Sequence, residues 1–251
     1  AAADIKDYYD YCRKEYRFIK QSNISLDYFT AIFPFQPRCF EVMRRITQNA
    51  EKHNLPTARS AIRMGWQVLS EPALQNGARL VAIPDLFNTD ELQKMPRSEG
   101  YKDAFQNLHD TFELLPTLDV SPEERDQARR LLQTLFLWAV SLPDNLRDGL
   151  TSQEIAEAAW LADDAVGAKA QTEYLFEKMI QNGFPVREEK KSREGKTVSI
   201  FSYELSAAQA NPVKYFGPLK KKAKEDAKAQ NDKWLESLFW QLPDMTQEAQ
   251  M

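Results

Sequence analysis

The chain has 251 residues, 43% of them hydrophobic and 28% charged, which is the composition of a folded globular protein of one or two domains. Its formal net charge of −4 excludes a uniformly basic nucleic-acid coat, and its 8 glycines disfavour an all-β fold with many tight turns. Two cysteines are too few for a disulfide scaffold or a zinc site, and the scarcity of histidine, with only His53 and His109, excludes a multi-histidine metal centre.

No apolar run approaches the length of about 18–20 residues that a membrane span needs, and the N-terminus has no signal-peptide pattern. We therefore expect a cytoplasmic protein without a membrane partner. The chain does not begin with methionine, which suggests a fragment of a longer protein.

The first 20 residues mix tyrosines with charges and predict a helix or a loop. Pro34 and Pro37 then exclude a helix interior and predict a rigid, extended corner that buries Phe33 and Phe35. A helix should follow over residues 39–50, because its apolar residues fall on one stripe: Cys39, Val42, Met43, Ile46 and Ala50.

A second helix should open at Thr57, which can cap it. Its apolar face is expected to contain Ala58, Ala61, Ile62, Gly65, Val68 and Leu69. Residues 80–83 form a short apolar run that predicts a strand or an extended segment leading into a turn.

Two capping boxes mark further helices. Ser121 can cap a helix whose first residue is Pro122, and Glu124 follows three residues after the cap. This pattern predicts a central helix that stops before Pro143. Thr151-Ser152-Gln153-Glu154 predicts a short helix, and a longer one should run from residue 163 to residue 180. Alternation of β-rich residues over 184–205 predicts a hairpin with a charged tip, and a polar helix should begin near residue 220.

Two helices followed by a charged hairpin, between residues 151 and 205, is the order of a winged helix, in which the second helix can enter the major groove of DNA and the hairpin can contact phosphates. On this interpretation the second helix presents Lys169, Gln171, Thr172 and Lys178 to DNA. The hairpin presents Arg187, Lys190, Lys191, Arg193 and Lys196.

The charge distribution gives this hypothesis limited support. Residues 187–233 hold 12 Lys or Arg against 7 Asp or Glu, so the basic residues gather in a chain that is otherwise acidic. Glu188, Glu189 and Glu194 on the same hairpin weaken its attraction for phosphates. Winged helices also serve as protein-docking or spacer modules, and a charged hairpin tip is what solvent exposure alone requires. Duplex binding should therefore be weak, with a log–log salt slope of about −3.

A second pattern is Thr57-Ala58-Arg59-Ser60-Ala61-Ile62-Arg63. Arg59 falls in the first turn of its helix, where the helix dipole already supplies positive charge, and Arg63 follows on the same face. Free backbone N–H groups and a guanidinium can converge there on an anion. The alternative is a surface salt bridge to a local acid.

This pattern resembles the sensor 2 helix of AAA+ ATPases, above all the origin-recognition type, in which the arginine reaches the γ-phosphate of ATP. Phe33-Pro34-Phe35-Gln36-Pro37 followed by this helix looks more closely like the lid of the large P-loop ATPases of phage-defence systems, the BREX ATPases of the BrxC and PglY kind. Their usual form is Pro-Phe-His-Pro and then Thr-Arg-Gly-x-Leu-Arg, so Gln36 and Ser60 depart from it. The specific resemblance covers residues 33–69.

The resemblance implies Arg59 and Arg63 as nucleotide-sensing residues, and ATP and Mg²⁺ as cofactors of a longer parent. This chain itself has no P-loop, because the glycine that should stand five positions before Gly195 is Lys190. We therefore expect no cofactor and no catalytic or metal site in the chain itself.

The expected fold is mainly α: a helical AAA+ lid-like domain over residues 1–148, a winged helix with one β-hairpin over 149–206, and a polar helical tail over 207–251 that leads to a missing downstream region. The function indicated is that of a non-catalytic part of a P-loop ATPase from a bacterial anti-phage defence system. Its partners would be the missing ATPase core, other defence proteins and duplex DNA. The alternative is a free-standing winged-helix DNA-binding regulator whose helical half dimerises.

Overall fold

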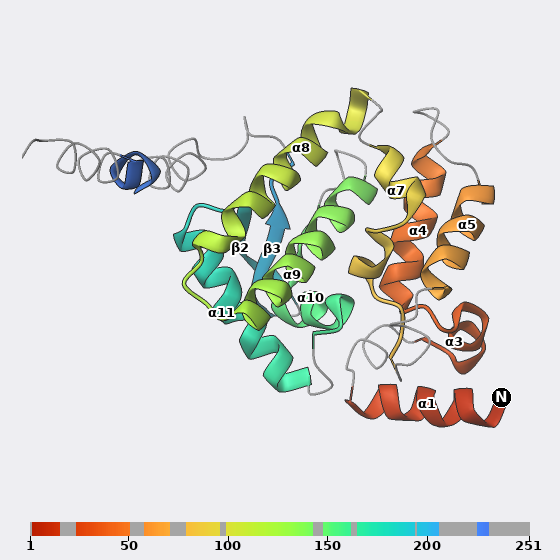
Figure 1. Ribbon diagram of the computed structural model, residues 1–251. Coiled ribbons are helices and arrows are strands. Elements are labelled where there is room, and N and C mark those ends of the chain that lie inside the picture. The colour runs from red at the N-terminus through yellow and green to blue at the C-terminus, as the bar shows by residue number, and fades with distance from the viewer. Residues whose placement is uncertain are drawn as a thin grey trace, which may run out of the picture.

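The computed structural model describes residues 2–15, 24–50, 58–70, 79–95, 99–142, 148–161, 165–193, 195–205 and 225–230. These residues form a mainly helical protein, as the sequence predicts, with one small antiparallel sheet of three strands. The expected hairpin supplies two of these strands, and residues 150–151 add a third that the sequence did not predict. Figure 1 shows the helices between residues 2 and 94 on one side of the molecule, and the sheet with its hairpin, beside the helix over residues 99–114, on the other. The N-terminal elements are α1 (Ala2–Glu15), α3 (Leu26–Ile32), α4 (Pro37–Ala50), α5 (Ala58–Leu69), the 3₁₀ helix η2 (Ile83–Leu86), α7 (Asp90–Lys94), α8 (Glu99–Leu114) and the 3₁₀ helix η4 (Leu115–Thr117).

The proline-rich corner connects α3 to α4. The Phe33–Pro34 peptide bond is cis, and α4 starts directly at Pro37. Phe35 packs against the core as expected, whereas Phe33 is 39% exposed, so the prediction that both rings are buried is wrong for Phe33. The described residues of the predicted apolar stripe of α4 are buried: Cys39, Val42, Met43 and Ile46.

The predicted strand at 80–83 is reduced to one bridge. Only Val81 pairs, with Phe35, and the chain turns into η2 at Ile83. The carboxylate of Asp85 accepts the backbone N–H of Ala82 at 2.8 Å and so fixes this turn. The local turn therefore ends the extended segment before a ladder can form.

Helix α5 buries only part of the expected face, with Gly65 and Val68 buried as predicted and Ile62 exposed. Met64 and Val68 are buried against the core, whereas Ile62 and Trp66 are each 74% exposed. The prediction for Ile62 is wrong because α4 and η2, against which α5 packs, meet the Met64 side of the helix. Thr57, the predicted cap, lies outside the described residues.

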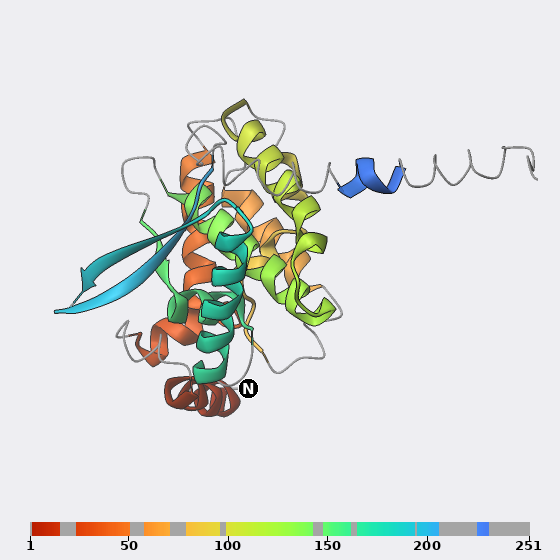
Figure 2. The same ribbon diagram turned by 90° about the vertical axis from the view of Figure 1, so that its left-hand side faces the viewer.

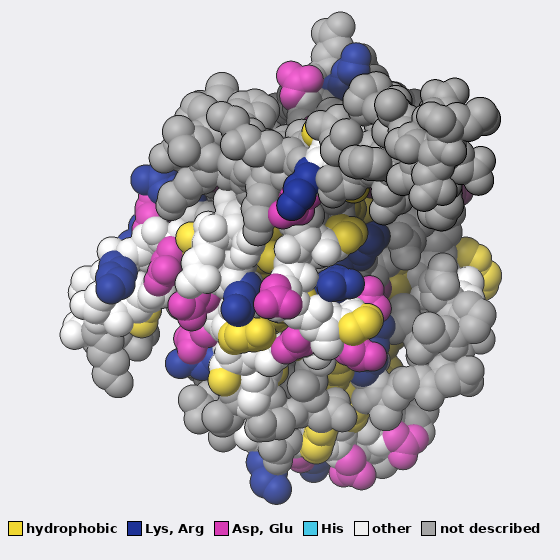
Figure 3. Space-filling model, turned by 60° about the vertical axis from the view of Figure 1, so that its left-hand side comes forward, with side chains coloured by type: hydrophobic (Ala, Val, Ile, Leu, Met, Phe, Trp, Pro, Cys, Tyr) yellow, Lys and Arg dark blue, Asp and Glu magenta, His cyan; other side chains and the backbone are white. Residues whose placement is uncertain are grey.

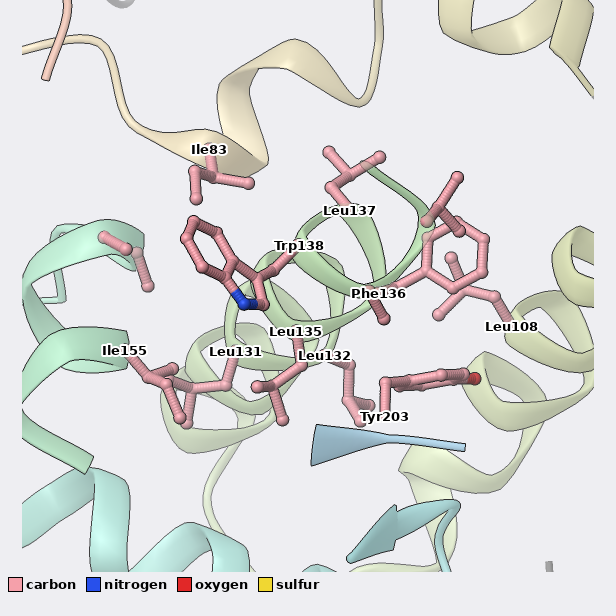
Figure 4. Close-up of a cluster of buried hydrophobic side chains, with 14 of the residues drawn as sticks. Ile83, Leu108, Leu131, Leu132, Leu135, Phe136, Leu137, Trp138, Ile155 and Tyr203 are labelled. Atoms are coloured by element: carbon pink, nitrogen blue, oxygen red, sulfur yellow. The ribbon is translucent and has the colours of Figure 1, made fainter. Parts of the chain in front are cut away.

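Helix α9 (Pro122–Ser141) is the centre of the fold. The predicted capping box is present: Ser121 Oγ accepts the N–H of Glu124 at 3.2 Å, and Glu124 accepts the N–H of Ser121 at 2.8 Å. Its C-terminal half is buried all round, and the helix as a whole contacts α4, η2, α10, α11 and β3. Figure 4 shows its apolar side chains pointing toward Ile83 on one side, Ile155 on another, and Leu108 and Tyr203 on a third.

The sheet follows α9. The elements after α9 are β1 (Leu150–Thr151), α10 (Ser152–Ala159), α11 (Ala165–Gln181), β2 (Val186–Arg193) and β3 (Lys196–Tyr203). The strand order is β1-β3-β2, with Leu150 opposite Phe201 and Val186 opposite Tyr203. Figure 2 shows that the β2–β3 hairpin projects away from the helices.

Glycines shape both ends of this sheet. A Cβ on Gly149 would lie 2.2 Å from the carbonyl oxygen of Phe201, so only glycine allows β1 to approach β3 this closely. Gly195 has φ +74° and makes the tight turn of the hairpin. In the Gly195-Lys196-Thr197 sequence, Gly195 therefore lies in the hairpin turn and the next two residues begin β3, which is not a phosphate-binding loop between strand and helix.

One hydrophobic core spans the predicted boundary at residue 148. It includes Val42 and Met64 on the N-terminal side and Phe176 and Phe201 on the C-terminal side, joined by α9. A smaller cluster packs α1 and α3 around Tyr9, Phe29 and Trp160. Of the predicted polar tail, residues 225–230 are helical and exposed, and the rest lies outside the described residues.

Candidate functional site

The two candidate nucleotide-sensing residues lie on the surface of α5. Arg59 is in its first turn and Arg63 is one turn further on, and both side chains are exposed. The helix contains no acidic residue, and Arg59 forms no ion pair with any described carboxylate. The local salt bridge that would explain Arg59 as a surface residue is therefore not formed within the described part of the chain.

The four candidate DNA-contacting residues of α11 lie in different environments. Lys178 is half-buried, with its ammonium 5.8 Å from the centre of the Tyr174 ring. Thr172 is fully buried and donates its hydroxyl to the carbonyl of Ala168 at 2.8 Å, so it cannot reach an external ligand, and its prediction is wrong. Gln171 is half-buried and donates to Glu124 of α9 at 3.2 Å. Lys169 is exposed and forms an ion pair with Glu173 at 3.6 Å.

The outward face of α11 is not basic. Besides Lys169 it exposes Ala170, Glu173, Tyr174 and Glu177. Two carboxylates on this face repel phosphates. The sequence pattern identifies the helix, but only its packing against α9 and α10 determines which side chains face outward.

Three of the five candidate hairpin cations are already paired with carboxylates. Arg187 contacts Glu189 at 3.0 Å, and Lys191 contacts Asp148 at 2.9 Å. Arg193 contacts Asp148 at 3.1 Å and Glu154 at 3.4 Å. Lys190 is exposed, and the side chain of Lys196 is outside the described set.

Two of these carboxylates come from outside the hairpin. Asp148 precedes β1, and Glu154 stands at the third helical position of α10, three residues after the N-cap Thr151. The second oxygen of Glu154 accepts a hydrogen bond from Arg38 of α4 at 2.8 Å. The ion pairs thus run from α4 through α10 to the hairpin. The sequence predicts a capping role for Glu154 but not its ion pairs. No sequence pattern singles out Asp148.

The electrostatics follow from these contacts. Burial by itself would raise the pKa of Glu154, but the charge of Arg38 and the hydrogen bonds of Thr151 hold it below its ordinary value. The pKa of Asp148 is lowered in the same way, with slight burial outweighed by the hydrogen bond and charge of Lys191 and the charge of Arg193. The hydrogen bond from Lys191 to Asp148 raises the pKa of that amine. All these groups are charged at neutral pH.

Arg38 belongs to a small aromatic cluster beside this network. Its guanidinium carbon lies 5.9 Å from the centre of the Trp138 ring, and that of Arg45 lies 4.6 Å from it. The indole N–H of Trp138 donates to the carbonyl of Asp148 at 3.0 Å. Trp138 therefore fixes the backbone of the residue whose carboxylate holds the hairpin.

Figure 3 shows the surface on the hairpin side of the molecule, where lysine and arginine side chains are interspersed with aspartate and glutamate. They do not gather into one basic surface among the described residues in this view. A surface of this kind binds nucleic acid weakly unless its internal ion pairs open.

A second charged cluster lies near the core and was not expected. Asp85 accepts two hydrogen bonds from Arg79, at 2.6 and 3.0 Å, and one from Arg130 at 3.2 Å. Arg130 also donates to the carbonyl of Ala159 at 2.7 Å. Burial would raise the pKa of Asp85, but the hydrogen bond from Arg79 and the charge of Arg130 hold it below the ordinary value. The cluster ties η2, α9 and α10 together.

Gln36, which stands at the position of the histidine in the phage-defence pattern, is also buried. Its side-chain amide donates to the backbone carbonyl of Glu157 in α10. The proline-rich corner is therefore anchored to the C-terminal half of the protein.

Comparison of the chain with protein-family models, curated proteins and solved structures finds no match. The described residues contain no group of three or more His, Cys, Asp or Glu that could hold a metal ion. None of the described helices has both the length and the hydropathy required to cross a bilayer. The geometry of the chain itself is thus the basis for assigning a function.

Proposed function

We propose that the winged helix expected over residues 149–206 forms and that it also includes α9, so that α9 is its first helix and α11 is its presented helix. The observation that supports this most directly is the order α9-β1-α10-α11-β2-β3 together with the sheet order β1-β3-β2. A projecting hairpin after the third helix is typical of this module.

The chain as a whole is proposed to be the non-catalytic lid and winged-helix portion of a larger P-loop ATPase, of the kind found in cytoplasmic bacterial phage-defence systems. The sequence resemblance over 33–69 supports this, and so does Arg59, which is exposed in the first turn of α5 and has no described carboxylate beside it. In that parent an upstream core would hold ATP and Mg²⁺, and Arg59 would reach the γ-phosphate while Arg63 supports it.

The winged helix is proposed to contact duplex DNA through its hairpin, without choosing a sequence. The outer face of α11 has no arginine for guanine edges and carries Glu173 and Glu177, so base reading from this helix is disfavoured. The hairpin offers lysine and arginine side chains interspersed with glutamates, which gives backbone contact and not sequence readout.

The upstream reading frame tests the ATPase assignment. It should encode a Walker A motif within the same open reading frame. A start codon near Ala1 instead would contradict the assignment and favour a free-standing winged-helix regulator whose helical half dimerises.

Charge reversal tests the hairpin. Replacing Lys190, Lys191 and Arg193 with Glu should abolish binding of a mixed-sequence duplex, with the far-UV circular dichroism spectrum unchanged. Binding as tight as that of the parent would place the DNA surface elsewhere and favour a protein partner for the winged helix.

A further inference from the structure

The carboxylates that pair with the hairpin cations are placed where the phosphates of a nucleic acid would have to bind. We propose that Asp148 and Glu154 act as internal substitutes for DNA phosphates and keep the hairpin in a closed, neutralised state that duplex DNA must displace. This inference rests on the proposed winged-helix function and adds to it a built-in competitor for the same surface.

The geometry of Asp148 resembles that of a bound phosphate. One of its carboxylate oxygens lies 2.9 Å from Lys191 Nζ, and the other lies 3.1 Å from Arg193 Nη2. A single anion thus bridges two neighbouring cations of β2, as two phosphate oxygens would. Glu154 adds a second carboxylate 3.4 Å from the other terminal nitrogen of Arg193.

Both acids are fixed to the body of the protein. The backbone of Asp148 is held by the Trp138 indole, and its carboxylate also accepts the N–H of Gly149 at 3.0 Å. Glu154 accepts the N–H of Thr151 at 2.8 Å and the hydrogen bond from Arg38. The cations, by contrast, are carried by the hairpin that projects from the body. The acids are therefore the preorganised half of each pair.

The consequence for DNA binding follows from counterion release. A cation that exchanges a carboxylate for a phosphate forms no additional ion pair, so the driving force from released counterions is largely lost. Each cation freed from its carboxylate should make the log–log salt slope more negative by about 0.9. Of the three phosphate contacts that underlie the expected slope of about −3, the two on Lys191 and Arg193 would be silent, so the intact chain should show a slope of about −1.

The test is the double variant Asp148→Asn/Glu154→Gln in the full chain. Asparagine keeps an oxygen that can accept the Gly149 N–H, and glutamine at position 154 can still close the capping box on Thr151. The matched control, Asp126→Asn/Glu113→Gln, removes one aspartate and one glutamate charge from exposed sites on α9 and α8, neither of them on α11 or the hairpin. Affinity for a fluorescein-labelled duplex of mixed sequence is measured by anisotropy over a range of salt concentrations.

The double variant should bind about tenfold more tightly than the parent at low salt, with a salt slope steeper by about 2. Each phosphate contact changes affinity by roughly half a decade between about 50 and 200 mM salt, and the variant gains two such contacts. The control pair should change affinity less than twofold. Adding Lys191→Gln and Arg193→Gln to the double variant should remove the gain. The single variant Asp148→Asn, at a more exposed carboxylate, should give a smaller gain in the same direction.

Three results would overturn the proposal. An equal gain in the control pair would show that only net charge matters, and a gain that survives loss of Lys191 and Arg193 would place the DNA on another surface. No gain in either Asp148 variant, with native circular dichroism, would show that these carboxylates do not compete with DNA. If charge reversal of the hairpin still abolishes binding in that case, the proposed winged-helix function stands and only the competition fails.

Discussion

The Arg79–Asp85–Arg130 cluster predicts a large loss of stability when its carboxylate is removed. The Asp85 side chain is only 9% exposed and receives four hydrogen bonds, three from guanidinium groups and one from the Ala82 N–H. Asp85→Ala leaves two cations without their partner and removes the acceptor that fixes the start of η2.

The magnitude follows from burial. Removing one member of a fully buried ion pair typically costs 3–5 kcal/mol, and because Arg79 and Arg130 are each about a quarter exposed, the lower end applies, about 3 kcal/mol. For a chain of this length that corresponds to a fall in Tm of about 6–12 °C. Asp85→Asn keeps the acceptor for Ala82 and should cost roughly half as much.

Urea denaturation followed by circular dichroism measures these free energies. A double-mutant cycle with Arg130→Met should give a coupling energy above about 1 kcal/mol, because the two groups share the cluster. Asp103→Ala, at an exposed acid of α8, is the control and should lie within about 0.5 kcal/mol of the parent. A loss of stability below about 1 kcal/mol for Asp85→Ala would refute the view that the buried cluster of Asp85 with its two arginines stabilises the fold.

Three further predictions concern nucleotide, pH and packing. In the intact parent, Arg59→Ala should lower ATP turnover by about tenfold or more, because a charge-assisted contact to phosphate contributes about 1.5–3 kcal/mol. Arg63→Ala should lower it by less. Turnover equal to that of the parent in a folded Arg59→Ala protein would show that Arg59 is an ordinary surface residue. Because the fold lowers the pKa of Asp85, its stabilisation is complete above the unfolded-state value of about 3.9 and is lost as pH falls through the lower folded-state value. Urea titrations should therefore show a steeper loss of stability in acid for the parent than for Asp85→Asn, and equal slopes would contradict this. Gly149→Ala should cost about 2–3 kcal/mol in the same denaturation assay, since its Cβ would overlap the Phe201 carbonyl, whereas a change below about 0.5 kcal/mol would show that β1 can move aside.

Features set by neighbours in the sequence could be predicted. The capping boxes at Ser121 and Thr151 form because a hydroxyl and a carboxylate three residues apart meet wherever a helix begins. The hairpin could be predicted because strand alternation and Gly195 act over a few residues. The proposal that Arg59 senses nucleotide also stems from a local pattern, and it remains a prediction.

Features that join distant parts of the chain were decided by tertiary structure alone. Lys191 meets Asp148 across 43 positions, and Arg38 meets Glu154 across 116. No local pattern encodes such a pairing, because a charged side chain in a sequence matches every opposite charge equally well. In the same way, helical periodicity allowed Ile62 on the buried face of α5, but the position of α4 and η2 placed it in solvent. The sequence thus determined which elements form, and packing around α9 determined which of their side chains remain available to a partner.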